Sequence, residues 1–248
     1  MQNFPREISI FYSIADIQAA GAGGGALIII DVMGAGAAVI AALESGIRRV
    51  IPVAAAAEAL RLREILGGEN VLLCGEEDGQ IIEGFDVGYV IPESAREKIA
   101  GKEMVLYSGE LAELELVRAI AADIYIGCFN NMKAVVEKIE RSSRIIILCA
   151  GRFGKFSIAD SVCAGMLIDR LLQDNDDERG LNDAAVTARY LYQKNKGRIR
   201  DLLPETERGR LLIKRGAEGE LANLSRVDIS ITTPVYKAED RFFVDDRC

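Results

Sequence analysis

The sequence predicts a three-layer α/β/α protein, with helices on both faces of a mainly parallel or mixed sheet. Short apolar runs alternate along the chain with segments of helical spacing, and glycine or other small residues separate them. A strand that is apolar along its whole length is buried on both faces, as in parallel sheets covered by helices. We find no clear linker in the sequence and therefore expect a single unit over residues 1–248.

The apolar runs are the candidate strands of this sheet. They are Leu27–Val32, Val50–Val53, Asn70–Leu73, Met104–Tyr107, Ile124–Gly127 and Arg144–Cys149. The predicted helices between and after them are Ala37–Ser45, Ala57–Leu66, Leu111–Ala122, Lys133–Ile139 and Asp160–Leu172. Glycine follows the first two helices, as is common at helix C-termini. Further on, we expect a loop over Gln173–Arg179, a helix over Asp183–Lys196 and strand character over Leu221–Ile231.

Charge and composition exclude several classes of function. The chain has 30 Lys and Arg against 38 Asp and Glu, so its net charge of −8 is expected to repel nucleic acid and anionic membranes. No apolar run reaches the roughly 18 residues of a membrane span. The first residues lack the pattern of a signal peptide, and we expect a cytoplasmic protein with no membrane partner. The composition is compatible with a homo-oligomer.

Two residue types limit the chemistry. Histidine is absent, which removes the commonest general base and a common metal ligand. Catalysis would therefore depend on carboxylates, hydroxyls, thiols, lysine, arginine or a metal held by oxygen atoms, and we expect Mg²⁺ as the cofactor. The five cysteines are widely spaced, which favours buried thiols over a disulfide or zinc pattern. Cys149 is interpreted in the same way and not as a nucleophile.

Acidic residues follow several predicted strands, where ligands of parallel sheets usually bind. Asp31 ends an apolar strand, and a carboxylate there needs a metal, a partner or solvent. We expect it to be catalytic and a metal ligand, although it could instead cap the next helix. Glu76 and Asp86 are the other expected metal ligands, with a solvated acidic turn as the alternative for Glu76. Asp160 is expected to be catalytic or to cap its helix.

Glycines and cations in the same loops indicate an anion site. Glycine lets the backbone approach an anion, and a helix that follows directs its free N–H groups toward it. Lysine and arginine can bind phosphate oxygens, although they could also balance nearby acids. The expected substrate-binding residues are Gly34, Gly36, Asn131, Gly151, Arg152 and Lys155.

Several blocks occur in an order that resembles the 2-phosphosulfolactate phosphatase family. They are Ile28–Val32, Cys74–Glu76, Glu83–Gly88, Leu148–Gly151, Gly154–Asp160 and Cys163–Gly165, continued by Gly209, Gly216, Asp228 and Pro234. Their order and spacing cover nearly the whole chain. The resemblance implies Mg²⁺-dependent hydrolysis of 2-phospho-3-sulfolactate to 3-sulfolactate and phosphate, on a route to coenzyme M or sulfolactate. The implied substrate is small and bears phosphate and sulfonate groups.

The chain departs from the family pattern at charged positions. Gly34 and Glu77 stand where the family usually has arginine, and Ala159 stands beside Asp160 in place of a second acid. Because a phosphate and a sulfonate need fixed cations, we expect weak or absent activity. One alternative is a family member without turnover that acts as an anion-binding or assembly protein. Another is a nucleotide-binding α/β protein, although Val39 occupies the third glycine position of that fingerprint.

Overall fold

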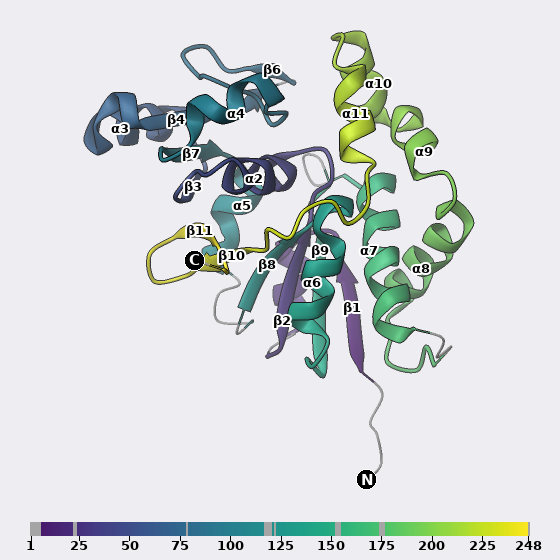
Figure 1. The fold of residues 1–248 in the computed structure, drawn as a ribbon. Helices are drawn as coiled ribbons and strands as arrows, with labels where there is room; N and C mark the ends of the chain where they lie inside the picture. The colour runs from purple at the N-terminus through teal and green to yellow at the C-terminus, as the bar shows by residue number, and fades with distance from the viewer. Residues whose placement is uncertain are drawn as a thin grey trace.

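A computed structural model describes residues 6–21, 24–77, 79–116, 121, 123–151, 155–173 and 177–247. These residues form an α/β fold around one mixed, mostly parallel sheet of nine strands (Figure 1). The strands are β1 Glu7–Phe11, β2 Ala26–Ile30, β3 Val50–Val53, β4 Val71–Cys74, β7 Glu103–Tyr107, β8 Asp123–Gly127, β9 Arg144–Cys149, β10 Pro234–Lys237 and β11 Phe242–Asp245. Their spatial order is β1-β9-β2-β8-β10-β11-β3-β7-β4. A separate pair, β5 Glu76–Glu77 and β6 Gln80–Ile81, forms a short hairpin.

Helices pack on both faces of the sheet, as expected for a three-layer protein. They are α1 Ile14–Ala19, α2 Ala35–Glu44, α3 Ala56–Leu66, α4 Glu93–Ile99, α5 Gly109–Ala112, α6 Met132–Ile139, α7 Ile158–Leu172, α8 Asp183–Asn195, α9 Ile199–Glu205, α10 Glu207–Lys214 and α11 Glu218–Leu224. Short 3-10 turns cover Gly68–Asn70, Glu113–Leu116 and Phe129–Asn131. Within the described part of the chain, no helix has the length and apolarity needed to cross a membrane.

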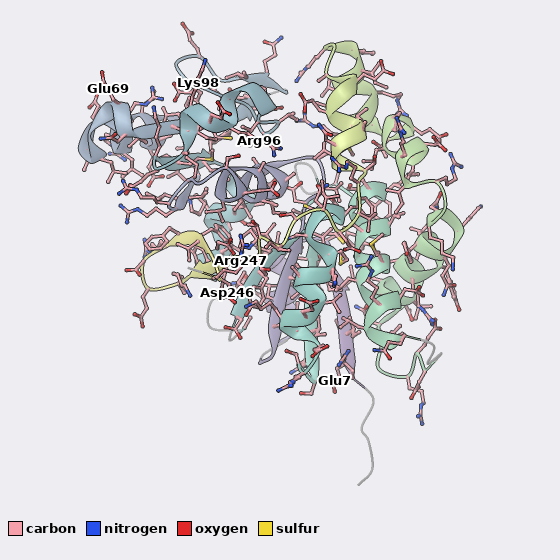
Figure 2. The ribbon with its side chains drawn as sticks, viewed as in Figure 1. Glu7, Glu69, Arg96, Lys98, Asp246 and Arg247 are labelled. Atoms are coloured by element: carbon pink, nitrogen blue, oxygen red, sulfur yellow. The ribbon has the colours of Figure 1, made fainter. Side chains whose placement is uncertain are left out.

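Strand β2, which lies between β9 and β8, shows how the two faces of the sheet are covered. All of its residues are buried, and they alternate between two separate cores. Leu27 and Ile29 belong to the core that contains α2, whereas Ile28 and Ile30 belong to the core shared with α6 and α7. This strand is apolar along its whole length because both of its faces are covered, as predicted. Charged side chains such as Glu69 and Lys98 lie at the surface (Figure 2).

The C-terminal hairpin was missed by the sequence analysis. Strands β10 and β11 are antiparallel to each other and lie between the two parallel parts of the sheet, with Val235 opposite Tyr125 and Phe243 opposite Val50. The prediction of strand character over Leu221–Ile231 was wrong. That range begins inside α11 and continues as irregular chain, which is held by the bonds from the Asp228 and Ser230 N–H groups to the carbonyls of Phe129 and Asn130.

At both edge strands of the sheet, backbone N–H groups donate hydrogen bonds to other segments of the chain. At β1, the Ile8 N–H donates to the Gly180 carbonyl at 2.9 Å, and the Ile10 N–H donates to the Asn182 side chain at 3.1 Å. At β4, the Leu73 N–H donates to the Asp86 carboxylate at 2.7 Å. Unpaired backbone groups at a sheet edge promote association with other strands, so these contacts protect the fold.

Candidate functional site

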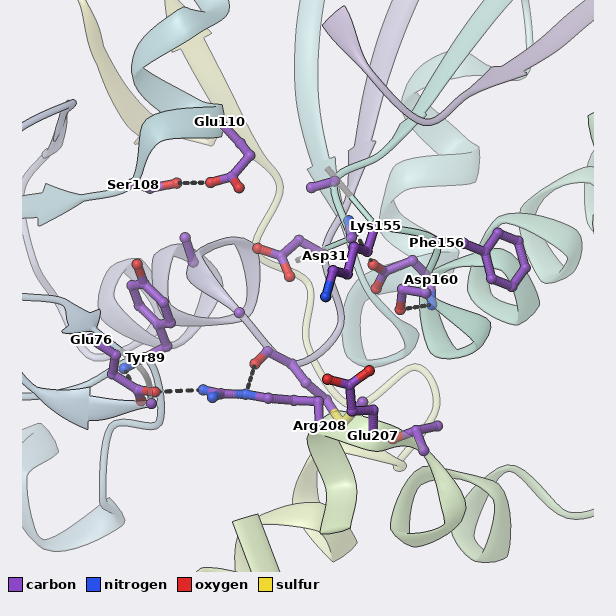
Figure 3. A pocket seen from close by; sticks show the side chains of 18 of the residues that line it. Asp31, Glu76, Tyr89, Ser108, Glu110, Lys155, Phe156, Asp160, Glu207 and Arg208 are labelled. Atoms are coloured by element: carbon purple, nitrogen blue, oxygen red, sulfur yellow. Dashed lines mark hydrogen bonds and ion pairs between the residues drawn. The ribbon is translucent and has the colours of Figure 1, made fainter. Parts of the chain in front are cut away.

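A cavity of about 710 Å³ opens at the carboxyl ends of two pairs of parallel strands, β2 with β9 and β4 with β7 (Figure 3). The two pairs belong to the two parallel parts of the sheet, which the antiparallel hairpin of β10 and β11 separates. Asp31 follows β2, Glu76 lies just after β4, Ser108 follows β7 and Gly151 follows β9. The N-terminal residues of α7 and α10 close other sides of the cavity. Asp31, Glu76 and Gly151 therefore line one cavity, and each of them follows a strand of the sheet.

Asp31 and Asp160 are buried carboxylates that both line this cavity. Their exposed fractions are 8% and 3%. Asp31 Oδ2 accepts a 2.8 Å hydrogen bond from the Gly36 N–H. The two oxygens of Asp160 accept bonds from the Val32 N–H at 2.9 Å and the Gly151 N–H at 3.1 Å. These backbone contacts fix both carboxylates at the end of the sheet.

The burial of this pair changes its protonation. Burial, together with the charge of Asp160, raises the pKa of Asp31 to about 8, although the Gly36 N–H opposes the shift. Burial also raises the pKa of Asp160 to about 6, against the stabilising N–H groups of Val32 and Gly151. Two adjacent carboxylates in a buried place are costly to charge together, so a cation bound there would stabilise both.

The two glycines after Asp31 make room for its side chain. A Cβ atom at Gly34 would lie 2.4 Å from Asp31 Oδ1, and one at Gly36 would lie 2.8 Å from Asp31 Cβ. Gly34 lines the cavity as expected, whereas the Gly36 N–H is occupied by Asp31 and Gly36 is not among the lining residues. The Gly34–Gly36 segment thus serves the packing of the carboxylate.

The loop after β9 brings a cation to the same site. Gly151 has a φ of 63°, and a Cβ atom there would lie 2.0 Å from the Lys155 carbonyl oxygen, so only glycine fits at this position. Lys155 extends into the cavity (Figure 3) and forms no ion pair with any other described residue. Its ammonium group is therefore available to an anion. Arg152, which was predicted to bind substrate, lies outside the described residues.

Two predicted site residues lie away from the cavity. The Asp86 carboxylate forms an ion pair with Arg63 and accepts the Leu73 N–H, and Asp86 does not line the cavity. Asn131 is fully buried, and its side chain bonds the Cys128 N–H and the carbonyls of Ile126 and Thr232. Both residues have structural contacts that account for their positions, and we leave them out of the proposed site.

Glu76 lies in the cavity, but it is bound to an arginine that the sequence analysis did not identify. Arg208 Nη2 donates to Glu76 Oε2 at 2.6 Å. Within the described residues, no group of three or more Asp, Glu or Cys side chains is arranged to hold a metal ion. Glu76 is the ion-pair partner of Arg208 in this cavity.

The lining of the cavity has more acids than bases among the described residues. The acids are Asp31, Glu76, Glu110, Asp160, Glu205 and Glu207, and the bases are Lys155, Arg208 and Arg210. Glu110, also missed by the sequence analysis, points into the cavity from the start of α5 (Figure 3) and accepts a 3.3 Å bond from Ser108. Glu77 does not line the cavity.

Comparison with known proteins shows which family the chain belongs to. A family model described as 2-phosphosulpholactate phosphatase matches residues 13–239. The chain belongs to this family. A probable 2-phosphosulfolactate phosphatase of Thermotoga petrophila is 31% identical over 207 residues, which are 84% of this chain and 87% of the relative. Proteins of the same description from Clostridium tetani and Clostridium acetobutylicum are 32% and 30% identical over 231 and 232 residues, in both cases 93% of this chain and 97% of the relative.

Membership in the 2-phosphosulfolactate phosphatase family confirms the resemblance seen in the sequence blocks. The cavity residues Asp31, Gly151 and Asp160 fall within those blocks. Arg208 lies outside them, in α10, a helix that was not predicted from the sequence. A signal was present, since Thr206 caps α10 by accepting the Gly209 N–H at 3.0 Å, and Thr is a common N-cap residue.

Proposed function

We propose that this chain is a Mg²⁺-dependent phosphomonoester hydrolase whose reaction takes place at Asp31 and Asp160. The observation that carries the proposal is the burial of these two carboxylates in one cavity at the ends of the parallel strands β2 and β9, where a bound cation would stabilise their charged forms. Lys155 provides a cation for a phosphate in the same cavity.

The donor set fits Mg²⁺. This ion usually binds proteins through one or two carboxylates and completes its shell with water and substrate phosphate oxygens, so a pair of acids is sufficient. Asp31 and Asp160 would hold it. When bound, Mg²⁺ offsets the charge of the phosphoryl oxygens and makes a bound water more acidic. The backbone N–H groups of Gly36, Val32 and Gly151 keep both carboxylates oriented during the reaction.

The name of the family implies phosphosulfolactate as a substrate. We expect 2-phospho-3-sulfolactate to be hydrolysed slowly by this chain, because the described lining of the cavity has more acidic than basic residues. The doubly anionic sulfolactate part of this substrate binds less favourably to such a lining than to one rich in free cations.

Phosphate release tests the proposal. The wild-type protein is assayed with 2-phospho-3-sulfolactate and with simple alkyl phosphates, with Mg²⁺ and with a chelator. Release should need Mg²⁺, and Asp31→Asn or Asp160→Asn should lower it by about 100-fold or more, comparable to the loss of a preorganised group from an active site. Asp86→Asn is the matched control, because this carboxylate lies outside the cavity. Absence of Mg²⁺-dependent release from every ester would favour an anion-binding family member without turnover.

A further inference from the structure

The guanidinium group of Arg208 is held on the cavity wall by two segments that are distant in sequence. Nη2 donates to Glu76 Oε2 at 2.6 Å, and Nε donates to the Met33 carbonyl at 3.3 Å. The side chains of Arg208 and Glu76 are only 13% and 8% exposed. Arginine carries five N–H donors in one plane, so these contacts fix the plane of the group. Nη1 has no partner among the described residues.

Glu76 is itself held in place. Its Oε1 accepts the Tyr89 N–H at 3.0 Å, and the Arg215 guanidinium lies 3.9 Å from Oε2. A Cβ atom at Gly88 would lie 2.6 Å from Oε1, so the position beside the carboxylate has room only for glycine. The orientation of Glu76 is therefore set by its surroundings before any ligand arrives, and Glu76 in turn orients Arg208.

Arg208 lines the same cavity as Asp31 and Asp160. Met33, which accepts the Arg208 Nε bond, is two residues after Asp31. The side chains of Arg208 and Asp31 both line this cavity (Figure 3). A small phosphomonoester with its phosphate at Asp31, Asp160 and Lys155 would have its alcohol part within reach of the cavity wall that contains Arg208.

We propose that Arg208 is the specificity-determining residue of this cavity, that it binds a second anionic group on the alcohol part of the substrate, and that Glu76 is its positioning residue. The inference rests on the proposed phosphatase function. A planar guanidinium matches the geometry of carboxylate and sulfonate oxygens. Glu76 offsets part of the positive charge of Arg208 and Arg215, so recognition by Arg208 depends on aligned hydrogen bonds as well as on electrostatic attraction.

Three matched ligands test the proposal. Ethyl phosphate has a neutral alcohol part, 2-phosphoglycolate has a carboxylate in place of the methyl group, and 2-sulfoethyl phosphate carries a sulfonate on that methyl carbon. Calorimetry with Mg²⁺ present gives the Kd of each ligand, and steady-state kinetics gives kcat/KM. We expect the wild-type protein to prefer at least one acid-bearing ester over ethyl phosphate. The ester with the larger preference identifies which anionic group Arg208 accepts.

Variants separate recognition from folding. Arg208→Met should reduce the preference for the acid-bearing ester roughly 10- to 100-fold, the range for a hydrogen bond to a charged group, and Arg208→Lys should retain part of it. Glu76→Gln should raise the KM for the acid-bearing ester with little change in kcat. Arg210→Met is the control, because Arg210 lines the same cavity but donates to the Glu205 carbonyl. It should keep the wild-type preference.

The outcomes are distinct. The role of Arg208 is overturned when the wild type shows no preference, or when Arg208→Met weakens all three ligands by the same factor. If Arg208→Met does not fold, the Arg208→Lys and Glu76→Gln variants test the role of Arg208 instead. The measured quantity is again the preference for the acid-bearing ester over ethyl phosphate. If the wild type hydrolyses none of the esters, the phosphatase function fails, whereas the calorimetric preference and its loss still decide the binding role of Arg208.

Discussion

Asp160 accepts a 2.9 Å hydrogen bond from the backbone N–H of Val32, the residue that directly follows Asp31. This bond fixes the first turn of α7 against the end of β2. It also places two buried carboxylates from distant parts of the sequence at one point in the fold. Because burial and mutual repulsion both oppose their ionisation, a proton or a cation at this point stabilises the folded protein.

The pair should make the stability of the metal-free protein depend on pH. The folded-state pKa values of about 8 for Asp31 and about 6 for Asp160 lie above the ordinary value of 3.8, so the folded state binds more protons than the unfolded state between these limits. The stability contributed by the pair is therefore complete below about pH 4 and is lost as the pH rises through about 6 and 8. Urea denaturation across this range should show a shallower decline for Asp31→Asn than for the wild type.

Magnesium provides the control for this experiment. Added Mg²⁺ should flatten the wild-type pH dependence, since a bound cation favours the charged carboxylates. It should have less effect on Asp31→Asn. Parallel pH curves for the wild type and the variant would show that the pair does not contribute.

Asn131 should prove structural. Its fully buried amide bonds the Cys128 N–H at 2.8 Å and the Thr232 carbonyl at 3.0 Å, which ties β8 to the C-terminal segment. Asn131→Ala leaves buried groups unpaired and should lower the free energy of unfolding by at least about 1–3 kcal/mol. Asn130→Ala is the matched control with a smaller loss, because its bonds to Asn223 and Arg226 are exposed. A changed KM in folded Asn131→Ala would contradict the structural role.

The strands that are apolar along their whole length could be predicted from the sequence. Strands such as β2 and β9 are buried on both faces, so their composition alone marks them. Strand β1 was missed because its buried and exposed residues alternate, as is usual at an edge. Strands β10 and β11 were missed because they are short, and their place in the middle of the sheet depends on contacts with Tyr125 and Val50.

The position of a residue directly after a strand helped to predict which residues line the cavity, whereas the residue type alone did not. Asp31 and Gly151 reach the cavity because parallel strands end at one edge of the sheet. Asp86 follows the same reasoning in sequence, yet the chain turns back along β4 and pairs it with Arg63. Arg208 comes from a helix far along the chain, and its approach to Glu76 is a tertiary contact that no local pattern indicates.

Cys149 should be unreactive and dispensable for catalysis. The thiol is fully buried in β9, and burial raises its pKa well above the ordinary value, so it stays protonated at neutral pH. Cys149→Ala should keep the wild-type rate of phosphate release and lose some stability from the small cavity that it creates. Alkylation by iodoacetamide should be slow in the folded protein. Rapid alkylation at this position, coupled to loss of activity, would point to a nucleophilic thiol.

Gly34 should be essential for the placement of Asp31. A Cβ atom there would lie 2.4 Å from Asp31 Oδ1 and 2.7 Å from Oδ2, so even alanine must displace the carboxylate. Gly34→Ala should weaken Mg²⁺ binding and phosphate release together, with a loss of about 1–3 kcal/mol in stability from overpacking. An arginine at this position meets the same obstacle, and Gly34→Arg should therefore reduce activity, although it adds a cation to the pocket.

Gly109→Ala is the matched control for this prediction. Gly109 also lines the cavity, but a Cβ atom there has no neighbour within 4 Å among the described residues. The comparison requires calorimetry with Mg²⁺, phosphate-release kinetics and urea denaturation of both variants. Gly109→Ala should retain the Mg²⁺ affinity of the wild type, because nothing near Asp31 has to move. Equal Mg²⁺ affinity in Gly34→Ala and in the wild type would mean that the Asp31 carboxylate adapts to the added methyl group, and that its observed position is not required for the metal.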